Sequence, residues 1–502
     1  MAGNLREREQ TTPTAAQLIE RVVDTGSFSS WDDPIDITRW HEDYREQLVR
    51  AAARSDSDEA VRTGRGTING RPVALIVNEF QFMAGSIGRA AADRIVTAIH
   101  RATSQRLPLL AFTASGGTRM QEGTPAFIRM IDITSALMSH RAAGLPYLVH
   151  LGHPTTGGVL ASWGSLGHIT FAEPKALVGF LGPRVYESLC EHPLPPDTQV
   201  SDHLVAAGIC DMLVRTEDFA AVADRAIGLI TDPPRPPTLT RRAAPPEGGN
   251  DTAKALALTL SSRRVGVRDV LRYGSTDFIP LGGSDRPCAM PVLTALARID
   301  GYPCVVAGQD RSAQVHIPIG PNSLRQARRA MMLAQELNMP FVSFIDTPGA
   351  ELSANAERRG IAAEIAHCIA TMLKLTVPTV AVLLGQGCGG AALALIAADT
   401  VIAAENAWLA PLPPHAAATI LFGDGAKALE VAASQRILAR DLYAENCVSA
   451  LIPEYPRDAD DRVGLAQAVA AEISAHIRHV VSRPRIIGDL VTRAAGHGRS
   501  PG

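Results

Sequence analysis

The chain lacks the features that mark several common protein classes. Its seven cysteines are scattered over 502 residues and no two form a C-x-x-C pair, so a zinc ribbon is not supported. The formal net charge is only −3, which gives no reason to expect nucleic acid or a membrane surface as a partner. The N-terminus has no apolar signal-peptide core, and the apolar runs are too short to span a bilayer. We therefore expect a protein of the reducing cytoplasm.

A long-period repeat is the most informative pattern that is present. Four sets of landmarks occur twice, 232 residues apart: Phe112/Phe344 (344−112), Pro146/Pro378 (378−146), Gly157-Gly158/Gly389-Gly390 (389−157) and Ala172-Glu173/Ala404-Glu405 (404−172). The triplet Gly70-Arg71-Pro72 is matched by Gly301-Tyr302-Pro303 at a separation of 231. Solenoid repeats run ~20–50 residues, so this period indicates a duplicated domain.

Within each copy, short β-branched runs alternate with helical patterns. Strands are expected at 73–77, 109–112 and 146–151 and again at 304–307, 341–345 and 379–384, with helices at 90–100 and 324–337. This alternation predicts βαβ units and the α/β fold class.

A proline-rich stretch separates the two copies. Residues 231–251 contain six prolines and two glycines, which cannot lie inside a regular element. The predicted organisation is a peripheral segment (1–29), a first domain (30–230), a linker (231–251) and a second domain (252–502).

Both copies contain a strand that runs into a Gly-Gly turn and then a helix of small residues. The first N–H groups of a helix have no internal partner and lie at the positive end of its dipole. Glycine lets a ligand approach that backbone closely and permits positive φ. The turns are therefore candidate oxyanion sites, and Gly157, Gly158, Gly389 and Gly390 are the predicted catalytic residues.

Two other interpretations of these turns stay open at this point. Gly385-x-Gly387-x-x-Gly390 is a literal G-x-G-x-x-G, and Glu405 lies 20 residues after Gly385, as in dinucleotide-binding folds. The first copy has no such motif, so the shared Gly-Gly pair is the better guide. Both turns could also be tight strand–helix connections with no further role.

A second loop recurs and is expected to line the same cleft: Ser115-Gly116-Gly117 corresponds to Thr347-Pro348-Gly349. Ser115 lacks the G-x-S-x-G elbow of a nucleophile, and no histidine or aspartate partner can be assigned to it. Cys388 is interpreted as a small packing residue, because nothing nearby would clearly lower the pKa of its thiol.

Long ordered blocks of sequence resemble a known family. Residues 79–88 (EFQFMAGSIG), 114–122 (ASGGTRMQE), 155–162 (TTGGVLAS) and 172–184 (AEPKALVGFLGPR) resemble the β subunit of bacterial acetyl-CoA carboxylase carboxyltransferase. Residues 344–350 (FIDTPGA), 356–360 (AERRG), 385–392 (GQGCGGAA) and 418–421 (ATIL) resemble its α subunit. The chain is thus similar to a β–α fusion. The resemblance implies a duplicated crotonase (ClpP/crotonase-like) fold, with two βα superhelical domains related by a pseudo-twofold.

The resemblance also implies a reaction. It is the transfer of a carboxyl group from carboxybiotin, held on a separate carrier protein, to the α-carbon of a short acyl-CoA, with acetyl-CoA giving malonyl-CoA. By resemblance, the Gly157-Gly158 turn faces the CoA thioester and the Gly389-Gly390 turn faces biotin. The implied binding residues are Ser115, Gly116, Gly117 and Arg119 on the CoA side, and Gly349, Gly387 and Cys388 on the biotin side. Arg119 could contact a phosphate or pair with Glu122, and both roles are open.

Three departures from the family pattern qualify these expectations. No cysteine precedes Cys190, so the β subunit's zinc ribbon is missing and no zinc is expected. His415 and Ala416 stand where the α subunit has a glutamate and a glycine. No biotin-attachment Met-Lys-Met is present, so biotin must arrive on a biotin carboxyl carrier protein of a biotin carboxylase complex.

The family further implies a homodimer or higher homo-oligomer, with the active site between the β-like half of one protomer and the α-like half of another. Alternatives are a biotin-independent malonyl-thioester decarboxylase, a hydratase using Glu122, and a degenerate scaffold subunit.

Overall fold

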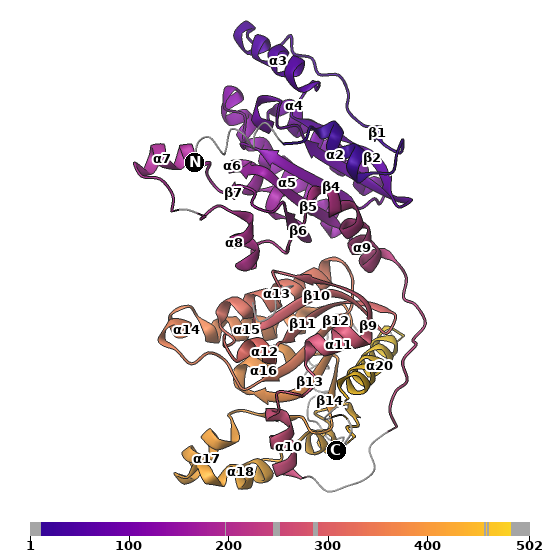
Figure 1. Ribbon diagram of the computed structural model, residues 1–502, viewed down its shortest axis with the longest axis vertical. Helices are drawn as coiled ribbons and strands as arrows, with labels where there is room; N and C mark the ends of the chain where they lie inside the picture. The colour runs from indigo at the N-terminus through magenta and orange to yellow at the C-terminus, as the bar shows by residue number, and fades with distance from the viewer. Residues whose placement is uncertain are drawn as a thin grey trace. The chain divides into compact units, whose positions relative to one another are not determined.

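The computed structural model of the chain describes residues 12–195, 197–243, 251–284, 290–455, 458 and 461–482 (Figure 1). The chain divides into two units, Met1–Gly228 and Leu229–Gly502. Each unit has its own apolar core. Within the part of the chain described, no helix is long and apolar enough to cross a membrane.

The first unit is built on one mixed sheet. Its strand order is β1-β2-β3-β4-β5-β6-β8, with β7 paired to β5. The strands are β1 Ser29–Ser30, β2 Val61–Ile68, β3 Arg71–Asn78, β4 Leu109–Ser115, β5 Tyr147–Thr156, β6 Ile169–Ala172, β7 Val178–Gly179 and β8 Met212–Leu213. The helices are α2 Ala15–Val22, α3 Glu42–Ser55, α4 Arg89–Ser104, α5 Gly123–Ala142, α6 Gly157–Leu160, α7 Pro183–Cys190, α8 Ser201–Ala206 and α9 Phe219–Thr231.

The second unit has the same topology. Read from one edge of its sheet to the other, the strand order is β16-β14-β13-β12-β11-β10-β9, with β15 paired to β13. Its strands are β9 Ser275–Leu281, β10 Val292–Ile299, β11 Tyr302–Gln309, β12 Phe341–Thr347, β13 Thr379–Cys388, β14 Thr400–Ala404, β15 Trp408–Ala410 and β16 Ala450–Ile452. Its helices are α10 Thr252–Leu260, α11 Val267–Gly274, α12 Arg311–Gln314, α13 Pro321–Glu336, α14 Ala354–Arg358, α15 Ile361–Lys374, α16 Gly389–Ile396, α17 Pro414–Phe422, α18 Ala428–Ser434, α19 Ala439–Ala444 and α20 Arg462–Val481.

The central parallel strands form because their residues are apolar on both faces. Every residue of β4 and of β12 is buried, as expected for strands covered by helices on both sides. The two units even share an irregularity: the β4–β5 register shifts between Thr113 and Ser115, and the β12–β13 register shifts between Ile345 and Thr347. These two positions are again 232 residues apart, so the repeat is structural.

Each unit also contains an antiparallel hairpin that the strand patterns did not reveal. Strands β2 and β3 are joined by Asn69 and Gly70, with φ of 48° and 77°. Strands β10 and β11 are joined by Asp300 and Gly301, with φ of 40° and 81°. Asn-Gly and Asp-Gly are the preferred pairs for two-residue turns with two positive φ angles, so the signal was present in the sequence.

Helix α2 makes part of the N-terminal segment an element of the first unit. Its buried face includes Ala15, Leu18 and Ile19, and the Ala15 N–H donates to the Glu79 carboxylate at 2.8 Å. Thr14 accepts a hydrogen bond from the Gln17 N–H and so caps the helix.

The two faces of the first sheet are covered differently. Helices α4 and α5 contribute Ile95, Ile133 and Leu137 to the core on one face. On the other face, the Phe219 ring of α9 packs edge-on against Phe112 at 4.6 Å between centroids. The face beneath α5 is the one that carries the Gly-Gly turn.

Candidate functional site

In the first unit, strand β5 passes directly into helix α6 at the Gly-Gly turn. Gly157 has φ of +64°, a conformation that glycine adopts without steric cost. Its N–H donates to the Phe180 carbonyl at 3.0 Å, so this donor is already used. The Gly158 N–H follows at the start of the helix, where no carbonyl of the same helix can accept it. Gly158 is therefore the residue whose N–H is positioned for a ligand.

Gly117 lies against this turn from the neighbouring loop. Its φ is +106°, and a Cβ on it would lie 3.2 Å from both the Gly157 Cα and the Gly158 nitrogen. The two backbone segments therefore touch, and a side chain at position 117 would push them apart. The structure brings together the predicted residues Gly117, Gly157 and Gly158.

Ser115 and Gly116 act within the same loop. The Ser115 hydroxyl donates to the Gly85 carbonyl at 2.6 Å and accepts from the Gly117 N–H at 3.0 Å, and the residue is fully buried. The Gly116 N–H donates to the Ala84 carbonyl at 2.9 Å. In this unit, the Ser115 hydroxyl therefore stabilises the loop by linking Gly85 to Gly117. This structural role agrees with the absence of a nucleophile signature around Ser115.

The partner of that loop is a segment with an unusual backbone. Met83, Ala84 and Gly85 have φ angles of 47°, 55° and 63°, three left-handed residues in succession. For residues with a Cβ this region is disfavoured. The sequence marked this segment only by family resemblance, because nothing about Met or Ala predicts positive φ.

Arg119 is enclosed by acidic and polar groups. Its guanidinium is fully buried and pairs with Glu59, with Nη1 at 3.0 Å from one Glu59 oxygen and 3.4 Å from Glu122. Burial opposes the charge of Arg119, but Glu59 outweighs it and raises the pKa of the guanidinium. Of the two roles left open by the sequence, the first unit shows the pairing with Glu122. The guanidinium has no exposed surface there for a phosphate.

The turn of the second unit shares the left-handed first glycine. Strand β13 passes into helix α16, and Gly389 has φ of +60°. Gly349, the counterpart of Gly117, has φ of +138°, and a Cβ on it would lie 3.9 Å from the Cys388 sulfur. Cys388 is 2% exposed and burial raises its pKa to about 11, so its thiol is neutral and packs under the turn.

Packing within the sheet explains the glycines of the G-x-G-x-x-G motif. A Cβ on Gly387 would lie 2.8 Å from the side chains of both Leu383 and Leu409. A Cβ on Gly385 would collide with the Asp346 carboxylate. Glu405 is engaged by the Glu454 N–H at 2.9 Å and by Arg440. Gly385, Gly387 and Glu405 are thus accounted for by contacts inside the second unit, and a Cβ on Gly390 would meet the Ile365 side chain at 2.7 Å.

The sequence is similar to a known family along nearly its whole length. Residues 6–485 match the model of the carboxyl transferase domain. The chain belongs to the carboxyl transferase family. It is 48% identical over 467 residues (92% of this chain, 94% of the relative) to a probable biotin-dependent acyl-coenzyme A carboxylase beta3 subunit of Mycobacterium tuberculosis. It is 33% identical over 480 residues (91% and 84%) to the acetyl-coenzyme A carboxylase carboxyl transferase subunits beta/alpha of Saccharopolyspora erythraea.

Solved structures agree on the fold. A crystal structure of transcarboxylase 12S with hydrolyzed methylmalonyl-coenzyme A bound superposes with a TM-score of 0.76 at 21% identity, covering 96% of this chain and 92% of that one. The α/β class and the duplicated crotonase fold are therefore confirmed. Among the side chains described, no group of three or more His, Cys, Asp or Glu could hold a metal ion.

Asp346 is a buried carboxylate that the sequence did not single out. It accepts from the Gln386 N–H at 3.0 Å and lies 3.4 Å from Arg311. Burial raises its pKa, and Arg311 opposes that effect. Gln314 donates to the Asp346 carbonyl at 2.9 Å, which fixes the start of the loop before Gly349. Two signals could have indicated Asp346: it directly follows the strand expected at 341–345, and it lies in the block 344–350 that resembles the α subunit.

His415, one of the departures noted in the sequence, lies in the first turn of helix α17. Its imidazole covers Gly425 closely enough to leave no room for a Cβ there. The side chain is otherwise exposed. It therefore packs locally against the segment that follows its own helix.

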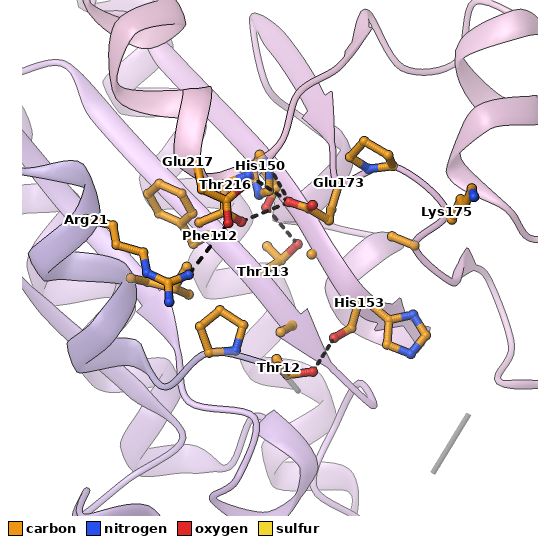
Figure 2. Close-up of a pocket in the computed structure, with 16 residues that line it drawn as sticks. Thr12, Arg21, Phe112, Thr113, His150, His153, Glu173, Lys175, Thr216 and Glu217 are labelled. Carbon is orange, nitrogen blue, oxygen red and sulfur yellow. Dashed lines mark hydrogen bonds and ion pairs between the residues drawn. The ribbon is translucent and has the colours of Figure 1, made fainter. Parts of the chain in front are cut away.

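A cavity of about 290 Å³ opens at the carboxyl ends of β4, β5 and β6 (Figure 2). The His150 Nε2–H donates to the Val214 carbonyl at 2.9 Å, and burial lowers the pKa of the imidazole to about 4, so the ring is neutral. Glu173 accepts from the N–H and hydroxyl of Thr216, both at 2.9 Å. None of the residues lining this cavity belongs to the Gly157-Gly158 turn, which contacts Met130 of α5.

Proposed function

We propose that the chain transfers a carboxyl group from carboxybiotin, held on a separate carrier protein, to the α-carbon of an acyl-CoA. One observation carries the proposal. A single chain contains two strand–glycine–helix turns with nearly equal φ at their first glycines, +64° at Gly157 and +60° at Gly389. Carboxyl transfer develops negative charge on two oxygens, those of the thioester and of the biotin ureido group. Two preorganised turns match that requirement.

The two turns are assigned to the two substrates. The Gly157-Gly158 turn takes the thioester oxygen, with Gly158 N–H as its donor, and the Gly389-Gly390 turn takes the ureido oxygen. A donor of this kind contributes ~3 kcal/mol to the transition state in enzymes where it has been removed. Carboxybiotin supplies the carboxyl group and the nitrogen that accepts the α-proton. No protein nucleophile is then needed, in agreement with the structural contacts of Ser115 and Cys388.

The acyl group and the chain architecture are proposed from the relatives. Relatives named as acetyl-coenzyme A carboxylase carboxyl transferase subunits beta/alpha support acetyl-CoA as the substrate and a β–α fusion as the chain. The relative at 48% identity is named only for acyl-coenzyme A, so other short acyl groups are the main alternative. We propose the cytoplasm as the location. The working form is proposed to be a homo-oligomer with a biotin carboxyl carrier protein and a biotin carboxylase as partners.

The decisive experiment incubates the purified protein with malonyl-CoA, with and without free biotin or biocytin. Loss of malonyl-CoA that depends on biotin is the expected result. Release of CO2 without biotin would instead identify a malonyl-thioester decarboxylase on the same fold. A folded protein with no turnover in either case would point to a scaffold subunit. The same assay with methylmalonyl-CoA, the carboxylation product of propionyl-CoA, compares the propionyl with the acetyl group as substrate.

A further inference from the structure

We propose that Arg119 is a positioning residue that holds the left-handed loop Met83–Gly85 against the Gly157-Gly158 turn. The guanidinium acts together with the carboxylates of Glu59 and Glu122, and we call these three side chains the clamp. The inference rests on the proposed function, because it assigns the clamp to the acyl-CoA side of the site.

The loop needs something to hold it. Met83 and Ala84 both carry a Cβ and both adopt positive φ, and Gly85 continues the left-handed run. Conformations of this kind persist only where the surrounding structure over-determines them, and they gather at functional sites. A Cβ on Gly85 would collide with the Ala114 carbonyl, so the loop also lies directly on strand β4.

The clamp contacts the far end of the loop through several hydrogen bonds. Arg119 Nη2 donates to the Ser86 carbonyl at 2.8 Å and also pairs with Glu59. The Arg119 N–H donates to the Ile87 carbonyl at 2.9 Å. The Phe82 ring, just before the loop, lies 5.3 Å from the guanidinium carbon. The guanidinium thus contacts both ends of the left-handed segment, at the Phe82 ring and the Ser86 carbonyl, and the Arg119 backbone adds a bond that a side-chain substitution leaves in place.

The same contacts connect the loop to the glycine turn. The Ile87 N–H donates to the Gly117 carbonyl at 2.8 Å, and the Gly116 N–H donates to the Ala84 carbonyl at 2.9 Å. Gly117 in turn lies against Gly157 and Gly158. A displacement of the loop would therefore pass directly to the N–H group proposed to face the thioester.

Glu122 secures the clamp from the other side. Its carboxylate accepts from the Tyr44 hydroxyl at 2.6 Å and from the Arg89 N–H at 2.7 Å, at the first residue of helix α4. The side chains of Arg119, Glu59 and Glu122 are 0%, 2% and 2% exposed. Removing three charged groups so completely from water has a large desolvation cost. Their retention is consistent with a geometric role.

The second unit provides an internal comparison. Bridges between Ile87 and Thr118 and between Ile319 and Ala350 fix the equivalence of the two loops. In the second unit, position 351 is glutamate where the first has Arg119, and position 354 is alanine where the first has Glu122.

The counterpart of the left-handed loop, residues 315–317, has no residue with positive φ. There the N–H groups of His316 and Ile317 both donate to the Ala313 carbonyl, in an ordinary helical turn. The strained loop and the clamp therefore occur together, and only in the copy proposed to take the thioester.

The test compares Arg119→Lys with Arg94→Lys. Lysine keeps the charge, but its single ammonium nitrogen cannot reproduce the separate positions of Nη1 and Nη2, which reach Glu59, Glu122 and the Ser86 carbonyl. Arg94 is a matched control: it is 8% exposed, belongs to the same unit and pairs with Asp58, the residue before Glu59. It contacts Asp58, Asp32, the Asp33 carbonyl and the Val61 carbonyl of strand β2, and none of these belongs to the loop.

For Arg119→Lys we expect kcat of biotin-dependent turnover to fall about 100-fold, as for a misplacement of a catalytic group by about 1 Å. The Kd for the CoA thioester should change less than about threefold, since ground-state binding does not need the displaced N–H. Arg94→Lys, at a comparable loss of Tm, should keep kcat within about threefold of the wild type.

Hydrogen–deuterium exchange provides a readout that does not depend on turnover. In Arg119→Lys, amides in the 82–88 peptide should exchange at least about tenfold faster, and Arg94→Lys should leave them unchanged. Unchanged exchange in Arg119→Lys, or equal loss of kcat in both variants, would overturn the inference. Faster exchange in a protein whose wild type transfers no carboxyl group would reject the proposed function and leave the clamp standing.

Discussion

Replacing Gly158 with alanine perturbs the turn proposed to face the thioester without straining its backbone. Gly158 does not have a positive φ, unlike Gly157, so alanine meets no conformational penalty there. The new Cβ would lie 2.8 Å from the Thr118 hydroxyl oxygen, whereas ordinary contact begins near 3.4 Å. Either the turn or Thr118 must therefore move by up to 0.6 Å (3.4 − 2.8). A displaced donor should lower kcat by about 10- to 100-fold, or about 1.4–2.8 kcal/mol.

The assay is biotin-dependent loss of malonyl-CoA, with kcat and KM measured separately. A second substitution, Thr118→Ala, should relieve the steric clash, because it removes the hydroxyl oxygen that the new methyl group meets. Within the described part of the chain the Thr118 hydroxyl has no hydrogen-bond partner, so its removal leaves no group unsatisfied. The double variant Gly158→Ala/Thr118→Ala should recover most of the lost kcat, with a coupling free energy of about 1–2 kcal/mol.

Gly390→Ala is the control in the second unit. Its Cβ would meet the tip of the Ile365 side chain at 2.7 Å, and such a tip can rotate away. We expect a smaller loss of kcat there. Wild-type kcat in Gly158→Ala, or a double variant no faster than the single one, would refute the assignment of the Gly158 N–H.

Three further predictions follow from single groups. Gly157→Ala and Gly389→Ala place a Cβ on a left-handed backbone and should each lower the free energy of unfolding by ~1–2 kcal/mol in urea titrations. An unchanged free energy of unfolding would contradict a fixed left-handed conformation at these glycines. Burial lowers the pKa of His150 to about 4 from 6.5, so the unfolded state binds more protons between those values and stability is lost as pH falls through that window. His150→Phe should therefore reduce the stability lost between pH 7 and pH 5 by about 2 kcal/mol, and an unchanged pH dependence would contradict the buried neutral imidazole. Because burial raises the pKa of Cys388 to about 11, iodoacetamide at pH 8 should label exposed Cys190 and spare Cys388 in mass spectra of the folded protein, and equal labelling would contradict its packing role.

The sequence predicted the central strands well, because a buried parallel strand has a continuous apolar run. The expected strand at 379–384 extends to Cys388, since β15 continues the pairing beyond the apolar residues. The hairpins were missed because β2 carries Gly64, Gly66 and two arginines, and the buried strand β10 is rich in leucine and alanine, which favour helices. The pairs Asn69-Gly70 and Asp300-Gly301 could have revealed them.

The site was predictable only in part. The glycine turns were found because glycine reports backbone conformation directly, and the repeat located both. Arg119 could not be assigned, because its main partner Glu59 is 60 residues away in sequence and only the fold brings them together. The positive φ angles of Met83 and Ala84 could not be predicted for a similar reason, since tertiary contacts and not local preference impose them. The roles of the predicted glycines in catalysis stay predictions.

The proline-rich stretch has a practical consequence for dividing the chain. Helix α9 runs to Thr231, and the residues after it are bound to the second unit. The Arg235 N–H donates to the Gly301 carbonyl at 2.8 Å, and the Thr238 N–H donates to the Asp300 carboxylate at 2.7 Å. Arg298 also donates to the Pro233 carbonyl at 3.0 Å. A truncation that starts at 252 would strip these contacts from the β10–β11 turn. An independently expressed second half should therefore begin near residue 229, because a start at 252 would also remove Arg241 and Arg242, which pair with Glu472 and Asp458.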